Sequence, residues 1–156
     1  MSANEEGGVV VIGYDGSDGA HQAIGQAAQL FGSRRALVVT VFQHVQELLI
    51  PSGLGVPVGR VSSELVDAIK EHAEELARQG AELARSGGFH AEPEALEAED
   101  RVADTILSVA RDRGASAIVV GSRGLGGVSS ALLGSVSSRL VHATDRPLLV
   151  VPPADS

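Results

Sequence analysis

Short apolar runs alternate along the chain with segments whose apolar residues recur at helical spacing. The runs lie at residues 9–12, 36–42, 117–120 and 148–151. Runs of this length, rich in valine, isoleucine and leucine, are typical of strands that a parallel sheet buries on both faces. Residues 89–97 form a more polar strand candidate, and their composition suits the edge of a sheet.

Four segments between the strands have helical periodicity. The first begins at Ser17 or Asp18, either of which can cap it, and ends before Gly32. The others cover residues 61–85, 101–113 and about 135–143. The predicted apolar face of the second helix consists of Val61, Leu65, Ile69, Leu76 and Leu83. That of the third consists of Val102, Ile106, Val109 and Ala110.

The order of elements predicts an α/β domain. Alternating strands and helices favour a doubly wound, five-stranded parallel sheet with helices on both faces. We expect one domain over residues 1–156, with residues 1–8 and 153–156 as loose tails. Ligands of such sheets bind beyond the carboxyl ends of the strands. This rule selects the segments that follow Ile12, Phe42, Glu97 and Val120.

Composition narrows the classes of function. Hydrophobic residues make up 44% of the chain, the net charge is −8, and cysteine is absent. A strongly anionic chain is a poor candidate for binding nucleic acid or an anionic membrane. The first eight residues lack the features of a signal peptide, and no apolar run is long enough to span a bilayer. We therefore expect a cytoplasmic protein with neither nucleic acid nor membrane as partner.

The segment with the clearest chemistry is rich in glycine and serine and covers residues 121–138. It runs from a strand end to a helix start, where backbone N–H groups can hold a phosphate. Arg123 and Ser135 would add side-chain donors. The segment is neither a P-loop nor a dinucleotide fingerprint. A Gly/Ser turn that binds nothing, with Ser135 as an ordinary helix cap, is the alternative.

The spacing within this segment resembles a known family. Gly121, two residues, Gly124, nine residues and then Gly134-Ser135 form the pattern of the ATP-binding branch of the universal stress protein family. VVIGYDGS at residues 10–17, ASAIVVGSRG at 115–124 and RPLLVV at 146–151 are similar to other segments of that family. The resemblance implies a Rossmann-like sheet of strand order 3-2-1-4-5 and a site for ATP, with or without Mg²⁺.

The resemblance also assigns expected roles to residues. Asp15 would contact the ribose or adenine side, or a magnesium ion; its alternative role is that of a plain turn residue. Gly13 and Tyr14 would form a wall beside it, and the backbone of Val41 would meet the adenine edge. The expected phosphate-binding residues are Gly121, Arg123, Gly124, Gly134, Ser135 and Val136.

Some positions depart from the family pattern. Asp100-Arg101-Val102 stands where the family commonly has Gly, Asp or Val, and Pro, beside the expected adenine pocket. Ser116 replaces a frequent aspartate in an expected structural role, and Val120 replaces a frequent methionine.

Catalytic residues are not evident. The five histidines have no metal-ligand spacing, and His21 is expected to be a surface residue of its helix rather than a phosphate contact. Lys70, the only lysine, lies far from the Gly/Ser segment in the sequence. We therefore predict no catalytic residues and no dedicated metal site.

The sequence is compatible with three functions. The first is an ATP-binding stress-response regulator that acts through an unknown protein partner and through a homodimer joined at the last strand, Leu148–Val151. The resemblance implies that seam, whereas a tail covering the strand is the alternative. The second is a slow ATPase or nucleotide-dependent transferase, and the third is an interaction module without nucleotide.

Overall fold

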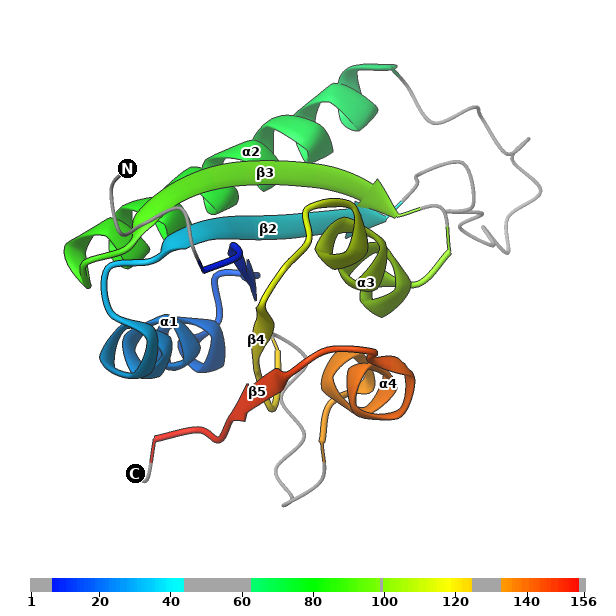
Figure 1. Ribbon diagram of the computed structural model, residues 1–156. Coiled ribbons are helices and arrows are strands. Elements are labelled where there is room, and N and C mark those ends of the chain that lie inside the picture. Colours follow the sequence, from blue (N-terminus) through cyan, green and yellow to red (C-terminus); the bar gives the residue numbers. More distant parts are fainter. Residues whose placement is uncertain (1–6, 44–62, 99, 125–132, 155–156) are drawn as a thin grey trace.

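A central sheet with helices on both faces forms the computed structural model of the protein (Figure 1). The structure describes residues 7–43, 63–98, 100–124 and 133–154. The elements are β1 (Val10–Gly13), α1 (Asp18–Phe31), β2 (Arg35–Gln43), α2 (Ser63–Ser86), β3 (His90–Ala98), α3 (Val102–Asp112), β4 (Ala117–Gly121), α4 (Ser135–Ala143) and β5 (Leu148–Val151). The predicted α/β class is confirmed.

The strands are parallel and follow the order β3-β2-β1-β4-β5. Val10 of β1 pairs with Ala36 of β2 on one side and with Ala117 of β4 on the other. The polar strand β3 lies at one edge of the sheet, as its composition predicted. Both the doubly wound topology and the order implied by the family resemblance are therefore confirmed.

Two apolar clusters hold the helices to the sheet. Val10 and Ile12 of β1 pack with α1 and α2 on one face, whereas Val11 packs with α3 and α4 on the other. All three side chains are fully buried. Successive strand residues point to opposite faces, so a run of valine and isoleucine supplies both clusters at once.

The expected apolar face of the second helix is only partly right: Ile69 and Leu76 are half-buried, but none of the predicted residues is fully buried among those that the structure describes. Leu65 and Leu83 are 48% and 38% exposed, and Val61 lies outside the described residues. The buried residues of α2 are Ala73, Ala77, Gly80, Ala81 and Ala84. A stripe of such small residues lets the helix backbone lie close to the sheet, where leucine side chains do not fit. The leucines are consequently displaced to the flanks of the helix.

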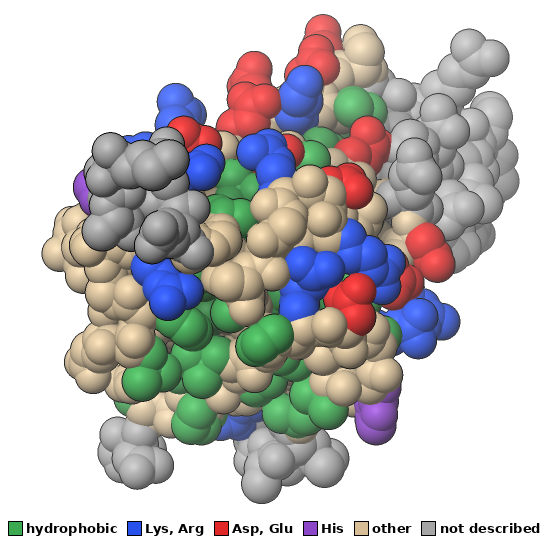
Figure 2. All heavy atoms as spheres, viewed as in Figure 1, with side chains coloured by type: hydrophobic (Ala, Val, Ile, Leu, Met, Phe, Trp, Pro, Cys, Tyr) green, Lys and Arg blue, Asp and Glu red, His purple; other side chains and the backbone are tan. Residues whose placement is uncertain are grey.

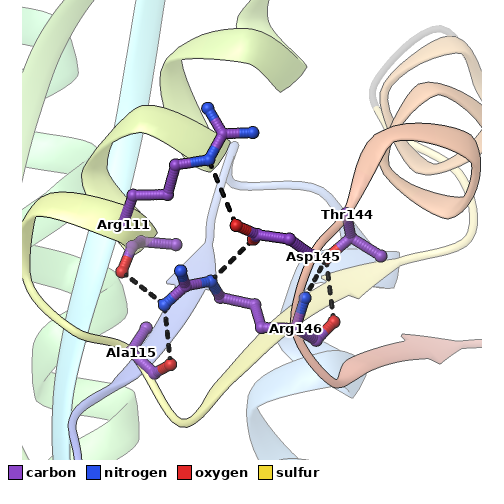
Figure 3. Close-up of polar contacts among 6 residues, drawn as sticks. Arg111, Ala115, Thr144, Asp145 and Arg146 are labelled. Atoms are coloured by element: carbon purple, nitrogen blue, oxygen red, sulfur yellow. Dashed lines mark hydrogen bonds and ion pairs between the residues drawn. The ribbon is translucent and has the colours of Figure 1, made fainter.

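Arg146 joins the end of α3 to the segment that enters β5 (Figure 3). Its Nη1 atom donates to the carbonyl oxygens of Ala110 and Ala115, each at 2.9 Å, and its Nε donates to Asp145 at 3.0 Å. Arg111 also donates to Asp145. These hydrogen bonds, the one from Arg146 foremost, lower the pKa of the Asp145 carboxyl. The network fixes the start of β5 against the C-terminal end of α3.

We expect Gly80→Ala to destabilise the protein, although alanine is the better helix former. A Cβ at Gly80 would lie 2.7 Å from Val38 Cγ1 and 2.8 Å from the Tyr14 ring. Overpacking of this kind costs about 1–3 kcal/mol. Gly25→Ala in α1 is the matched control, because nothing lies within 4 Å of its Cβ position. It should raise stability by up to about 1 kcal/mol.

Urea unfolding followed by circular dichroism measures both changes. Equal stabilisation by the two substitutions would contradict the close approach of α2 to the sheet.

Candidate functional site

A pocket of about 330 Å³ opens at the carboxyl ends of β1, β2 and β4. Its lining includes all ten site residues that the sequence predicted: Gly13, Tyr14, Asp15, Val41, Gly121, Arg123, Gly124, Gly134, Ser135 and Val136. They come from segments at both ends of the chain. The fold therefore brings the predicted residues together around one cavity.

One side of the pocket is apolar. Side chains of the cluster beneath α3 and α4 line it, and we call five of them the apolar wall: Val39, Val41, Val102, Ile106 and Val120. Val102 belongs to the segment that departs from the family pattern, so this departure places a valine in the wall. Strand β3 contributes none of the described lining residues. The expected contribution of the segment after Glu97 is therefore limited to Val102 and Ile106.

The turn after β1 is held from both sides. Asp15 Oδ1 accepts a hydrogen bond from the backbone N–H of Ser17 at 2.9 Å. The backbone N–H of Tyr14 donates to Val39, and Thr40 Oγ1 donates to the Tyr14 carbonyl, both at 2.9 Å. Gly16 has a φ of +82°, which favours glycine. Asp15 is thus a turn residue and a pocket residue together.

The loop after β4 packs directly against this turn. A Cβ on Gly124 would lie 2.6 Å from Asp15 Oδ2, and one on Gly121 would lie 2.9 Å from the backbone of Gly19. A Cβ on Gly19 would in turn lie 2.7 Å from the Arg123 carbonyl oxygen. The sequence suggested that glycines let an anion approach the backbone. In the structure, Gly121 and Gly124 also allow the close contacts of this loop with Gly19 and Asp15.

Helix α4 starts at the pocket. Gly134 is its N-cap and makes no side-chain cap hydrogen bond, so the alternative role of Ser135 as an ordinary cap is wrong. Ser135 is the first helical residue, and its side chain is exposed. Ser137 Oγ donates to the Ser122 carbonyl at 2.8 Å, and the Gly134 N–H donates to the same oxygen at 2.7 Å. These bonds fix the helix start against the β4 loop.

Eight lining residues were not among the ten predicted site residues: Ser17, Ala20, Val39, Val102, Ile106, Val120, Ser122 and Ser137. Two of them follow from periodicity. Val39 lies two residues before Val41 on the same face of β2, and Ile106 lies one helical turn after Val102. Ser122 and Ser137 contact each other across 15 positions. This contact could not be predicted from the sequence, because it joins two segments that only the fold brings together.

His21 supports the turn from helix α1. Its Nε2 atom lies 3.2 Å from the Tyr14 hydroxyl, and its Nδ1 lies 2.9 Å from the Ser17 carbonyl oxygen. A carbonyl only accepts, so Nδ1 carries a proton and donates to the Ser17 carbonyl oxygen. His21 is exposed, as expected, and is absent from the described pocket lining. It orients Tyr14 and does not reach the pocket.

The described lining contains one basic side chain, Arg123, and one acidic side chain, Asp15. Among the described residues, no group of three or more His, Asp or Glu is arranged to hold a metal ion. Residues 125–132 of the Gly/Ser segment lie outside the described part of the chain. In the parts that are described, no helix combines the length and the apolarity needed to cross a membrane.

The protein has a Rossmann-like α/β fold with a pocket at the carboxyl ends of its strands. A model described as the universal stress protein family matches residues 8–152, and the chain belongs to this family. A universal stress protein of Thermus aquaticus is 36% identical over 145 residues, which cover 91% of this chain and 96% of that protein.

Solved structures agree with the fold. The structure of the hypothetical protein MJ0577 has a TM-score of 0.75 and 20% identity, covering 96% of this chain and 98% of that one. A universal stress protein in complex with cAMP has a TM-score of 0.63 and 21% identity, with 94% and 98% covered. One from Archaeoglobus fulgidus in complex with dAMP has a TM-score of 0.60 and 23% identity, with 93% and 97% covered.

We expect Tyr14, the single tyrosine of the chain, to ionise above the ordinary range. Burial raises the pKa of its hydroxyl from the usual 10.0, and the Asp15 carboxylate raises it further. A raised folded-state pKa stabilises the protein fully below about pH 10, and the stabilisation is lost as pH rises through the folded value. Phenolate absorbance measures the titration without interference, because tryptophan is absent.

Asp15→Asn should lower this pKa only part of the way, since burial is the larger cause. Tyr14→Phe, which has no tyrosine, gives the background absorbance. A tyrosine that titrates in the folded protein as it does in a free peptide would contradict the buried position.

Proposed function

We propose that this protein binds ATP, with or without Mg²⁺, in the pocket at the carboxyl ends of the strands and acts as a stress-response regulator in the cytoplasm. The observation that carries the proposal is the convergence of all ten motif-derived residues on one cavity. Two proteins of the same fold have been solved with the adenine nucleotides cAMP and dAMP. The full spacing of Gly121, Gly124 and Gly134-Ser135 supports the triphosphate in particular.

The lining suits the parts of the nucleotide. The apolar wall offers valine and isoleucine surfaces to a flat purine, and the backbone of Val41 can hydrogen-bond its edge. Asp15 Oδ2 would accept from a ribose hydroxyl, because a carboxylate beside phosphates would repel them. Arg123 and the first N–H groups of α4, at Ser135 and Val136, would hold the phosphates.

Binding without rapid turnover fits these residues better than an enzyme does. Phosphoryl transfer needs a positioned base and groups that neutralise the developing charge. Asp15 Oδ1 is already held by the Ser17 N–H, and Arg123 is the one described basic side chain in the lining. We therefore expect phosphate release slower than about one per minute, which corresponds to a barrier well above that of typical enzymes.

The edge strand β5 supports the proposed homodimer. The carbonyls of Pro147 and Val151 accept from Ile118 and Ser122, next to β4. Alternate strand residues point their N–H and C=O groups to the same side, so Leu148 and Val150 direct theirs away from the sheet. Figure 2 shows apolar side chains at the surface over β5. A second copy can pair with this edge across a two-fold axis.

We expect Arg123→Gln to weaken ATP binding about ten-fold, which equals about 1.4 kcal/mol. The change removes the described cation of the lining and keeps a side chain of similar length. Ser135→Ala should have a smaller effect in the same direction. Isothermal titration calorimetry with Mg-ATP measures the dissociation constants, and unfolding without ligand verifies that each variant folds.

Arg78→Gln is the matched control, because Arg78 is exposed on α2 and pairs with Glu75 away from the pocket. ATP or ADP released from the freshly denatured protein at about one per chain would support the proposal directly. Absence of any heat or melting shift at millimolar Mg-ATP would refute it and leave the module without nucleotide.

We expect Val150→Pro to convert the dimer to a monomer. Proline removes an N–H that points away from β4, so pairing within the sheet is kept while pairing with a second copy is lost. Light scattering after size exclusion measures the mass. Leu30→Lys is the control, since Leu30 is 65% exposed and belongs to α1 rather than to β5. A wild-type protein that is monomeric at high concentration would overturn the proposed seam.

A further inference from the structure

A second hollow lies at the opposite end of the sheet from the nucleotide pocket. It has a volume of about 700 Å³ and is formed where β2 and β3 begin. Its described lining, which we call the arginine groove, consists of Gly7, Gly8, Val9, Arg35, Ala36, Leu37, Arg85, His90, Ala91, Glu92 and Arg113. It shares no described residue with the nucleotide pocket.

Positive charge is concentrated here in a chain of net charge −8. Arg35, Arg85 and Arg113 line the groove, with Glu92 as the one described acidic lining residue. Arg34 adds a fourth guanidinium, because its Nη1 lies 3.2 Å from the Cβ position of Gly7. Like charges placed together repel each other unless an anion compensates them. The groove is therefore electrostatically prepared for a negatively charged ligand.

Contacts within the protein use only part of this donor capacity. Arg113 pairs with Glu94 through Nη2 at 3.0 Å, and Arg85 donates through Nε to the Ala91 carbonyl at 2.9 Å. These two bonds hold the side chains in place, and no described residue pairs with the other guanidinium nitrogens of Arg85 and Arg113. The Arg35 side chain makes no hydrogen bond or ion pair with any described residue. Arg85 and Arg113 lie at the C-terminal ends of α2 and α3, where a positive side chain stabilises the helix dipole. Arg35 has no such role, because it belongs to strand β2.

We propose that the arginine groove binds a compact anion that carries two or more phosphate groups. A guanidinium presents a planar fork of donors that matches phosphate oxygens bidentately. The volume is within the range of small-molecule sites. Glu92, Glu94 and Glu97 follow one another along the edge strand β3 and would repel an acidic peptide laid beside it. The net charge of −8 similarly disfavours a long nucleic acid.

The test uses inorganic tripolyphosphate as the probe in calorimetric titrations of the full chain. Arg123→Gln serves as the background, so that phosphate binding in the nucleotide pocket is weakened. We expect saturable binding, and Arg35→Gln should raise its dissociation constant at least about five-fold. Arg78→Gln, which removes the same charge from the outer face of α2, should change it less than about two-fold. Mg-ATP affinity of the otherwise wild-type chain should be unchanged by Arg35→Gln.

Several results would overturn the assignment. One is the absence of saturable binding up to about 10 mM probe in low salt, where screening is weakest. Another is an equal loss of affinity in Arg35→Gln and Arg78→Gln, which would show attraction to net charge alone. A short poly-glutamate peptide that competes as well as tripolyphosphate would show a carboxylate site instead. Failure of ATP binding would leave this proposal intact, because the two sites have separate residues and separate variants.

Discussion

The pocket depends on the close contact between the turn after β1 and the loop after β4. The carbonyl oxygen of Arg123 approaches Gly19 so closely that a Cβ there would lie 2.7 Å away, and Gly124 lies against the Asp15 carboxylate. Residues more than 100 positions apart in the chain thereby form one continuous surface. The hydrogen bonds from Gly134 and Ser137 to the Ser122 carbonyl then fix the start of α4 on the same loop. Without this contact, the strand ends would supply the pocket residues but not their common orientation.

Small residues also bring elements into close contact on the face of the sheet that packs against α1 and α2. The stripe from Ala73 to Ala84 on α2 brings the helix backbone close to β2, and Gly80 receives the Tyr14 ring. Tyr14 is therefore clamped between α2 and His21 of α1. The position of the Asp15 turn is consequently set by packing on the face opposite the apolar wall. Both faces of the sheet contribute to the geometry of one site.

The sequence predicted the helices and strands well because they are encoded locally. The valine runs of β1 and β4 predict buried strands, and the motif from Gly121 to Ser135 marks residues that the fold gathers in one pocket. The face of α2 was mispredicted because hydrophobic periodicity gives leucine more weight than alanine. Which side of the helix approaches the sheet is decided by Val38 and Tyr14, which belong to other segments. The contact of Ser137 with Ser122 was missed for the same reason.

The polarity of a parallel sheet gives its two ends different means of holding an anion. Each helix that connects two parallel strands runs back antiparallel to them, so helix N-termini, such as that of α4, lie at the carboxyl ends of the strands. There, backbone N–H groups and a favourable dipole can hold a phosphate with few charged side chains, and the proposed site has Arg123 as its one described basic lining residue. At the other end, α2 and α3 direct their C-terminal carbonyls toward the groove, so their dipoles oppose an anion. An anion there requires several guanidinium groups, and this is where Arg35, Arg85 and Arg113 gather.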